Sequence, residues 1–326
     1  MNGIPQMMEE DVFEKVSIVI PTLNRKEELR KCLNSVYRQD YPHLEVVVID
    51  NGSTDGTQEM IGSEFPGVRF FRFEKNIYAC KARNFGVAKS SGAYVWFLDS
   101  DSVIHRDDCL STMLSLIRLD DNVGSIGGTA YVFEDGSTKI VLPQRNSFDL
   151  FSDWDQESFQ RVGCDFLPSS NLLMKKEILL KIGGFVELYG YLLEDNDLGI
   201  RIVKRGLKNI TDRRTIAFHP YKPPPNNFRK AYLFYRNSFL YVFLNYQWTD
   251  WASIIADRLQ RNWDRSKNRS GNKNELPPQR LADRLKIRLG FLSGLIVAFL
   301  FLFIPVCFWM KCRSTNYVAQ YMGKKE

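Results

Sequence analysis

Two short acidic motifs have the residue types and the spacing needed to bind a cation and to move a proton. Asp99-Ser100-Asp101 follows an apolar run and places two carboxylates one residue apart. Mg²⁺ and Mn²⁺ prefer oxygen ligands, and they usually bind through one or two carboxylates together with substrate phosphates. Glu194-Asp195-Asn196-Asp197 is the second motif, and a carboxylate within hydrogen-bond reach of a hydroxyl can take its proton during attack. The chain therefore carries acids suited to a divalent metal and acids suited to a general base.

Each motif also has a purely structural interpretation. The first motif can form a solvated acidic turn, since two acids one residue apart often occur by chance. Glu194 can be a first-turn acid that the helix dipole favours. Asp197 can pair with Arg201, four residues later on one helix face. The residue types alone leave Glu194, Asp195 and Asp197 as candidates for a base.

The elements expected around the first motif are alternating strands and helices. Nearly uninterrupted apolar strands are predicted at 16–20, 45–49, 68–73 and 93–98, with helices between them at 26–38, 55–65 and 78–89. This alternation predicts an α/β fold with a mostly parallel sheet and helices on both faces. Asp50 and Asp99 each come directly after one of these strands. Because ligands bind beyond the carboxyl ends of the strands in such sheets, both acids are expected at one binding rim.

The chain after residue 120 is expected to complete the same domain with a less regular half. Strands are predicted at 123–133, 138–142, 171–175 and 209–218, with helices at 176–182 and 194–205. An aromatic-rich segment is expected to be helical and either to pack under the domain or to lie at a membrane interface. The expected divisions are an N-terminal extension 1–15, a catalytic domain 16–227 with halves 16–120 and 121–227, the aromatic segment 228–263, and a basic linker 264–288.

Residues 289–310 form a run of 22 uncharged residues. As a helix rising about 1.5 Å per residue, this run is about 33 Å long, which is enough to cross a bilayer; a buried core helix is the alternative. Ten Lys or Arg in 258–288 and the basic tail 311–326 flank the run, whereas the first 257 residues are net acidic in a chain of net charge +6. This pattern favours a membrane over nucleic acid as the partner, and we expect a single-pass transmembrane helix with the catalytic domain in the cytoplasm.

Six short motifs follow one another along the chain in an order that resembles that of a known protein family. They are Ile20-Pro21-Thr22-Leu23-Asn24-Arg25, Val48-Ile49-Asp50-Asn51-Gly52-Ser53-Thr54-Asp55-Gly56, Ala82-Arg83-Asn84-Phe85-Gly86, Leu98-Asp99-Ser100-Asp101, Gly183-Gly184-Phe185 and Glu194-Asp195-Asn196-Asp197-Leu198. In this order they resemble the motifs of the family 2 glycosyltransferases, and the resemblance covers residues 15–220. It implies a GT-A fold, in which an α/β half binds a nucleotide-linked sugar and a mixed half binds the acceptor.

The resemblance implies that the first four motifs bind the donor. The resemblance then implies that Asp50 contacts the nucleotide base, commonly uracil, and that Asp99 contacts the ribose. The full set of donor-side residues is Pro21, Thr22, Asn24, Asp50, Ser53, Arg83, Asp99 and Ser100.

The resemblance also implies a metal and a base. Asp101 would hold Mg²⁺ or Mn²⁺ on the diphosphate, with Asp99 and His219 as further ligands, although a loop histidine without a role is an equally good interpretation of His219. Asp195 would be the general base, and the sugar would be transferred with inversion. The expected acceptor-side residues, for which cap and turn roles are alternatives, are Asn171, Gly184 and Arg201.

The expected function is transfer of a sugar from a nucleotide-diphosphate sugar to a hydroxyl of a membrane-associated acceptor. The acceptor would be a lipid-linked glycan, a glycolipid or a cell-surface polysaccharide. A sugar nucleotidyltransferase is one alternative, but it needs a Gly- and Arg-rich phosphate loop where Pro21–Lys26 contains no glycine. A membrane-anchored binding module without activity is the other, against which the acids Asp50, Asp99, Asp101 and Asp195 argue.

Overall fold

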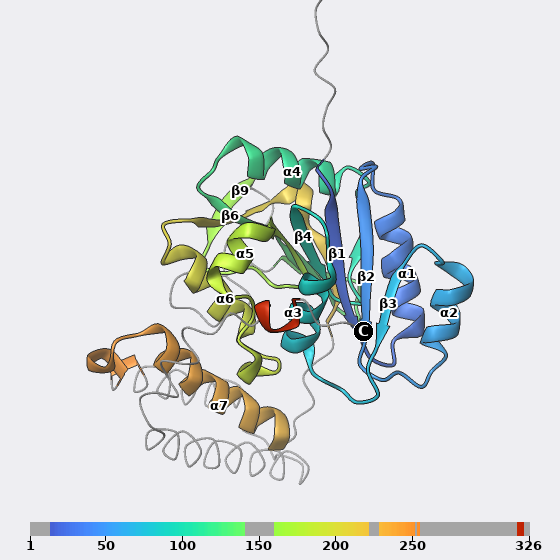
Figure 1. Ribbon diagram of the computed structural model, residues 1–326. Helices are drawn as coiled ribbons and strands as arrows, with labels where there is room; N and C mark the ends of the chain where they lie inside the picture. Colours follow the sequence, from blue (N-terminus) through green and yellow to red (C-terminus); the bar gives the residue numbers. More distant parts are fainter. Residues whose placement is uncertain (1–13, 141–159, 222–227, 252, 255–317, 323–326) are drawn as a thin grey trace, which may run out of the picture.

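The computed structural model describes residues 14–140, 160–221, 228–251, 253–254 and 318–322 (Figure 1). An eight-stranded sheet runs through the domain in the order β3-β2-β1-β4-β10-β6-β11-β9, and a four-stranded sheet has the order β5-β12-β7-β8. The strands are β1 (Val16–Thr22), β2 (Leu44–Asp50), β3 (Arg69–Arg72), β4 (Tyr94–Leu98), β5 (Val103–Ile104), β6 (Val123–Gly127), β7 (Thr129–Val132), β8 (Thr138–Ile140), β9 (Arg161–Cys164), β10 (Asn171–Lys175), β11 (Lys208–Asp212) and β12 (Ala217–Pro220).

Seven α-helices are described, together with short 3-10 turns. The helices are α1 (Lys26–Tyr37), α2 (Thr57–Glu64), α3 (Ala79–Lys89), α4 (Cys109–Leu119), α5 (Lys176–Ile182), α6 (Glu194–Val203) and α7 (Phe228–Asn245). The 3-10 turns are η1 (Glu187–Tyr189), η2 (Arg213–Thr215), η3 (Trp248–Asp250) and η4 (Ala319–Tyr321). The predicted alternation of strand and helix in the first half is confirmed, and strands β3, β2, β1 and β4 pair in parallel. In the second half β10 runs antiparallel to β4 and β6, so the large sheet is mixed.

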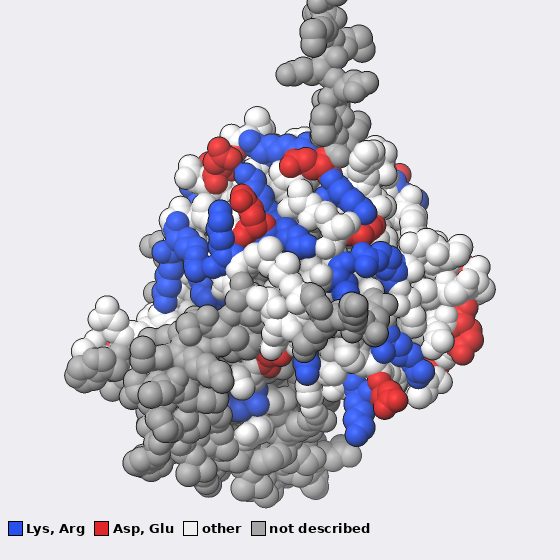
Figure 2. Space-filling view, viewed as in Figure 1, with Lys and Arg blue, Asp and Glu red and all other residues white. Residues whose placement is uncertain are grey.

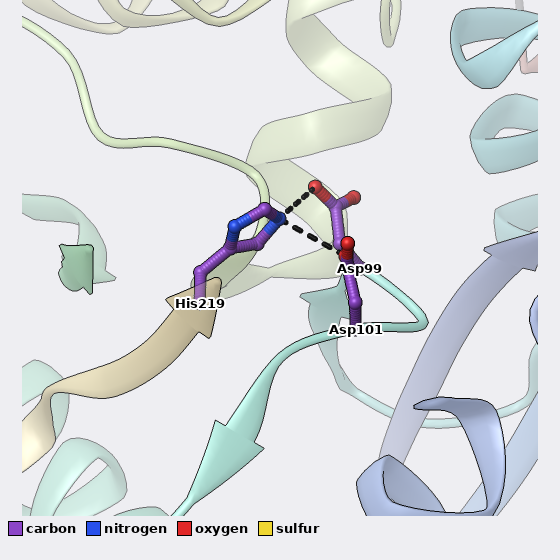
Figure 3. A group of neighbouring side chains, drawn as sticks. All are labelled: Asp99, Asp101 and His219. Carbon is purple, nitrogen blue, oxygen red and sulfur yellow. Dashed lines mark ion pairs between the residues drawn. The ribbon is translucent and has the colours of Figure 1, made fainter. Parts of the chain in front are cut away.

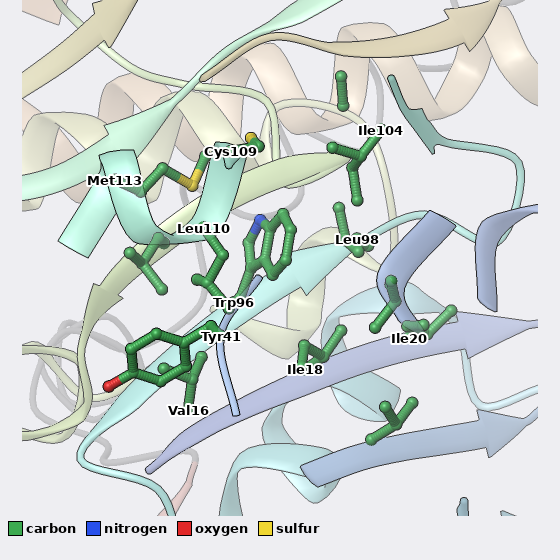
Figure 4. Packing of buried hydrophobic residues seen from close by; sticks show 14 of the residues in the cluster. Val16, Ile18, Ile20, Tyr41, Trp96, Leu98, Ile104, Cys109, Leu110 and Met113 are labelled. Atoms are coloured by element: carbon green, nitrogen blue, oxygen red, sulfur yellow. The ribbon is translucent and has the colours of Figure 1, made fainter. Parts of the chain in front are cut away.

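Helices cover both faces of the large sheet because successive residues of its strands point to opposite faces. Ile18 of β1 packs in one cluster with residues of α1 and α4, whereas its neighbour Val19 packs in the other with residues of α3 and α5. Figure 4 shows the first cluster around Trp96, whose ring is fully buried. Burying each large apolar side chain contributes about 1.5–3 kcal/mol, so these two layers supply much of the stability that holds the rim of the sheet in place.

Two apolar runs that the sequence predicted as single strands are each divided between the two sheets. The run 123–133 breaks after β6, and Gly128 has φ +145° at the break. A Cβ at Gly128 would lie 2.2 Å from Thr211 Oγ1, so only glycine fits there. The run 209–218 breaks at η2, where the Asp212 carboxylate accepts from the Arg214 backbone N–H. The single-strand predictions were wrong because local turns redirect both chains into the small sheet.

Helix α7 and the C-terminal segment 318–322 pack on the side of the domain that carries α3 and α6. α7 contacts α6 and η1. Val318 is fully buried, and the Tyr321 ring lies 5.8 Å from the Phe85 ring. The Tyr321 hydroxyl donates a 2.7 Å hydrogen bond to Glu187 in η1. The C-terminal segment is therefore part of the folded domain.

The predicted linker 264–288 and the apolar run 289–310 lie outside the described residues. Within the described ranges, no helix has both the length and the apolar character that crossing a bilayer requires. The helical prediction for 228–263 is confirmed over α7.

Charged side chains of both signs share the surface over α5 and α6. Figure 2 shows Lys and Arg on this face with Asp and Glu among them. Two of them form a pair within α5, where Lys181 Nζ lies 3.4 Å from Glu177. Exposed pairs of this kind contribute little to stability, and they neutralise part of the basic charge on this face.

Candidate active site

The carboxyl ends of β1 and β2 form one side of the candidate site. Thr22 pairs with Asp50 in parallel register, so both strands end at the same level. The buried Asp50 carboxylate accepts from the Ser53 backbone N–H at 3.1 and 3.2 Å and lies 3.3 Å from Arg72 Nε. The Asn24 backbone N–H donates to Ser53 Oγ at 2.8 Å and joins the two loops. This rim brings together the predicted donor-side residues Pro21, Thr22, Asn24, Asp50 and Ser53.

The acids that follow β4 meet a histidine from the small sheet (Figure 3). His219 Nε2 lies 3.0 Å from Asp101 Oδ1 and 3.7 Å from Asp99 Oδ2. One ligand atom from each of the three side chains lies within 4.8 Å of the others. His219 reaches this place because β12 pairs antiparallel with β5, which begins two residues after Asp101. The three predicted metal-side residues are thus neighbours.

The chemistry of this cluster fits a divalent metal. Asp101 is only 2% exposed, and among the described residues its oxygens accept no hydrogen bond and are balanced by ion pairs with Arg25 and His219. His219 Nδ1 lies 2.9 Å from the Pro220 carbonyl oxygen, so a neutral ring that keeps its proton on Nδ1 would direct the Nε2 lone pair at a cation held between the carboxylates. Carboxylate oxygens suit Mg²⁺ and Mn²⁺, and imidazole is a usual transition-metal ligand.

Arg83 of α3 connects the first acidic motif with the second. Its Nη2 lies 2.8 Å from Asp99 Oδ1, and its Nη1 lies 3.2 Å from Glu194 Oε1. Burial acts to raise the pKa of Asp99, but the positive charges of Arg83 and His219 hold that pKa below its ordinary value. Asp99 therefore stays ionised, as a carboxylate must to hold a ribose hydroxyl or a cation.

Asp195 lies on the same side of the domain, half-buried at the start of α6. Burial raises its pKa, although Arg83 and Ser169 act in the opposite direction. Burial and the charge of Asp195 likewise raise the pKa of Glu194, which Arg83 offsets in part. Asp195 Oδ1 is buried without a hydrogen-bond partner among the described residues. A raised pKa and an unoccupied lone pair are what a proton acceptor needs.

Asp197 is engaged in a separate network. It is 1% exposed and accepts from Arg201 Nε at 2.8 Å, from Asn245 Nδ2 at 2.7 Å and from the Tyr189 hydroxyl at 3.3 Å. Arg201 also donates to the Ile182 carbonyl at 2.7 Å. These contacts are those of the helix-face pair that the sequence offered as the structural interpretation of Asp197 and Arg201.

The chain just before the second acidic motif is strained. Leu192 and Leu193 have φ angles of +71° and +67°, a region that residues with a Cβ seldom adopt. Each such residue costs about 1–3 kcal/mol and persists only where the surrounding structure imposes the conformation. Strain of this kind next to Glu194 and Asp195 is typical of a functional site.

Two of the predicted acceptor-side residues have structural contacts. Asn171 is fully buried; its Nδ2 donates to the carbonyls of Gly128 and Thr215 at 2.6 and 2.7 Å, and its Oδ1 accepts from Trp96 Nε1 at 2.8 Å. Gly184 has φ +76°, and a Cβ there would lie 2.7 Å from Asn84 Oδ1. Asn171 thus joins β10 to β4 and to the turns at Gly128 and Thr215, whereas Gly184 lies against Asn84 of α3. Ser100 is buried between the two acids of its motif.

The sequence did not single out two residues that the structure adds. Arg25 pairs with Asp101, and its place beside Asn24 in the first motif was an available signal. The Tyr131 ring lies 5.4 Å from the His219 ring, and burial with the nearby charge of Asp99 raises its pKa. No spacing or charge pattern marks Tyr131, since only the pairing of β7 with β12 brings it here.

Comparisons with known proteins agree with this arrangement. The sequence profile of the family described as "Glycosyl transferase family 2" matches residues 17–183. The amylovoran biosynthesis glycosyltransferase AmsB of Erwinia amylovora is 30% identical over 213 residues, which are 62% of this chain and 68% of that protein. Glycosyltransferase AglE of Haloferax volcanii is 28% identical over 220 residues, 64% of this chain and 67% of that protein.

Similarity of fold extends to a solved structure. The mannosyltransferase PcManGT from Pyrobaculum calidifontis, in complex with GDP-Man and Mn²⁺, superimposes with a TM-score of 0.53 at 17% identity, covering 96% of this chain and 88% of that one. At this identity the likeness concerns the fold, and it agrees with the predicted GT-A class. Together with the ordered motifs, these matches show that the chain belongs to glycosyl transferase family 2 and is a glycosyltransferase.

Proposed function

We propose that this enzyme transfers a sugar from a nucleotide-diphosphate donor, with inversion, to a hydroxyl of a membrane-associated glycan or lipid-linked acceptor. The observation that supports this most directly is the buried Arg83, which binds Asp99 of the metal-side group and interacts electrostatically with Asp195 of the second acidic motif. A cation-side pair of acids and a separate acid of raised pKa are the two parts that this reaction requires. The donor sugar and the acceptor are left to the experiment below.

The donor-side roles follow from the rim of β1, β2 and β4. Asp50 and the loop around Asn24 would bind the nucleotide base, and Asp99 would bind the ribose. Asp101 and His219 would hold a divalent cation, which neutralises the charge that develops on the leaving diphosphate. Arg83 would keep Asp99 ionised and contribute positive charge close to the donor.

Asp195 is the preferred base of the three acids in its motif. Asp197 is bound by Arg201 and Asn245, and Glu194 is paired with Arg83. Asp195 would accept the proton of the acceptor hydroxyl while the hydroxyl oxygen of the acceptor bonds to the anomeric carbon. The bond from that carbon to the diphosphate oxygen breaks in the same step. A single displacement of this kind inverts the anomeric centre.

The test is a transfer assay with a panel of nucleotide sugars and a membrane lipid extract, with Mn²⁺ or Mg²⁺ and then with chelator. Asp101→Ala and Asp195→Ala proteins are assayed in parallel, with binding of the nucleotide measured separately. We expect turnover of one donor, lost with chelator and in both variants, while Asp195→Ala still binds nucleotide. Nucleotide binding without turnover of any donor would instead identify a binding module.

We also propose that the apolar run 289–310 holds the domain at a membrane from the cytoplasmic side. The single crossing expected from the sequence puts the tail on the far side, whereas Val318 and Tyr321 pack against α3 and Glu187. Seven residues, 311–317, join the run to Val318, and at about 3.5 Å each they reach about 25 Å, less than the hydrocarbon thickness of about 30 Å. We therefore propose that the tail segment containing Val318 and Tyr321 lies on the same side of the membrane as the domain.

Labelling of a cysteine in the tail tests this topology. In vesicles whose cytoplasmic face is outside, a membrane-impermeant maleimide should label the Lys325→Cys protein. The labelling should exceed that of the unsubstituted protein in the same vesicles. Labelling only from the opposite face would restore the single crossing. Recovery of the chain without membranes would end the membrane proposal itself.

A further inference from the structure

The backbone that carries the second acidic motif is held from behind by two neighbouring polar residues of α7. Asn237 is fully buried, and its Nδ2 donates to the carbonyls of Tyr189, Tyr191 and Leu192 at 3.0, 2.8 and 2.8 Å. One side-chain amide thus serves three carbonyls of a short loop that begins within η1. This loop, residues 188–193, leads directly into Glu194 at the start of α6.

Arg236 adds a second set of contacts to the same loop. Its Nη2 donates to the carbonyls of Leu188 and Tyr189 at 2.7 and 3.1 Å. Its Nε and Nη2 also donate to Asn237 Oδ1 at 2.9 and 2.6 Å, which fixes the orientation of the Asn237 amide. The two side chains therefore act as one unit, with donors directed at the carbonyls of residues 188, 189, 191 and 192.

The loop needs such support because its conformation is unfavourable by itself. Leu192 and Leu193 both have positive φ angles, and they immediately precede the acids. On its other side the loop is joined to α3, since the Gly190 carbonyl accepts from the Cys80 N–H at 3.2 Å and Tyr191 stacks on Tyr78 with ring centres 6.4 Å apart. α3 carries Arg83, which binds Glu194. The loop is thus held between α7 and α3, and the acids extend from it into the site.

We propose that Arg236 and Asn237 form a positioning pair that holds Asp195 in the orientation needed to accept the acceptor proton. Neither residue reaches the cation-side acids or the rim of β1 and β2, so the pair serves proton transfer and leaves donor binding unaffected. This proposal rests on the proposed function, in which Asp195 is the base.

The test compares Asn237→Ala and Asn237→Asp with Asn245→Ala. Asn237→Asp keeps the size of the side chain but replaces the donor with an acceptor that the loop carbonyls repel. Asn245 is the matched control, because it is a buried asparagine of the same helix. Its amide donates to Asp197 and makes no contact with the 188–193 carbonyls among those described. Transfer rate, donor affinity and hydrogen exchange of the amides in 188–193 are measured for each protein.

Displacement of a reacting group by about 1 Å can lower a rate about 100-fold. We therefore expect kcat for transfer to fall at least about tenfold in both Asn237 variants, with the nucleotide-sugar Kd within about twofold of the original. Exchange in 188–193 should become faster in those variants and stay as in the original protein for Asn245→Ala. Unchanged kcat, or an equal loss in Asn245→Ala, would overturn the proposal.

The exchange measurement separates this proposal from the proposed function. If the original protein transfers no sugar from any donor, the proposed function fails and exchange alone decides about the pair. Faster exchange confined to 188–193 in the Asn237 variants then supports the positioning role. Unchanged exchange there overturns it.

Discussion

Arg83 and Glu194 stand 111 positions apart in the sequence, and their side chains meet inside the domain at 3.2 Å. Arg83 is 4% exposed and Glu194 is 7% exposed, so the contact joins two charges that water scarcely reaches. The same guanidinium binds Asp99 at 2.8 Å. One buried cation thus links the strand that ends at the metal-side acids with Glu194, the first residue of the helix that carries the proposed base Asp195.

Removing this cation should destabilise the protein strongly. Arg83→Met leaves Glu194 buried beside Asp195 without its partner, and breaking a buried pair costs about 3–5 kcal/mol. The free energy of unfolding from denaturant titration measures the effect. Arg106→Met is the matched control, because the pair with Asp108 is on the surface and should contribute little. An equal loss in both variants would contradict the prediction.

Stability should depend on pH through Glu194. Burial and the neighbouring Asp195 raise its pKa in the folded protein, so the folded state binds this proton more readily than the unfolded chain does. Its favourable contribution is present at low pH and is lost as pH rises through the raised pKa. With chelator present, the free energy of unfolding of the original protein should therefore fall, relative to that of Glu194→Gln, as pH rises above the ordinary range of a glutamate. Parallel curves for the two proteins would show that the pKa is not raised.

Cation binding should depend on His219. His219→Ala removes the imidazole nitrogen 3.0 Å from Asp101 and should weaken Mn²⁺ binding by about tenfold or more, measured by electron paramagnetic resonance of the unbound ion with nucleotide present. His43→Ala, which changes an exposed histidine before β2, should leave the affinity as it was. Equal affinities for all three proteins would favour the interpretation of His219 as a loop histidine.

Two helical glycines should respond in opposite directions to the same substitution. At Gly86 a Cβ would lie 2.5 Å from Val19 Cγ1 and 2.7 Å from Ile49 Cδ1, so Gly86→Ala should destabilise the protein by about 1–3 kcal/mol. At Gly62 nothing lies within 4 Å of a Cβ, so Gly62→Ala should stabilise it by about 0.5–1 kcal/mol. Thermal unfolding of both variants measures the difference. A destabilised Gly62→Ala protein would contradict this argument.

Much of the first half could be predicted from the sequence because its signals are local. Apolar runs of strand length alternate with amphipathic helices, and parallel strands end at one rim. The sequence therefore predicts that Asp50 and Asp99 lie at the same rim of the sheet. The ordered motifs added the expected family, which the comparisons confirm.

Other features depend on contacts between distant segments, which no local pattern encodes. The sequence left Glu194, Asp195 and Asp197 as candidate bases. Only the contacts made in the folded protein show that Asp197 is bound by Arg201 and Asn245 and that Glu194 is paired with Arg83. The run 123–133 looked like one strand because its break at Gly128 is imposed by Thr211, more than eighty residues later. Tertiary packing likewise places Tyr131 beside His219 and Val318 against α3.

The sequence by itself thus determined which residues carry charge, where strands begin and end in the regular half, and which family motifs are present. Tertiary structure alone decided which acids are paired, which stay available and how the 188–193 loop is held. The physical reason is range: backbone periodicity acts over a few residues, whereas burial and the pairing of charges depend on whatever chain segment lies across the interior.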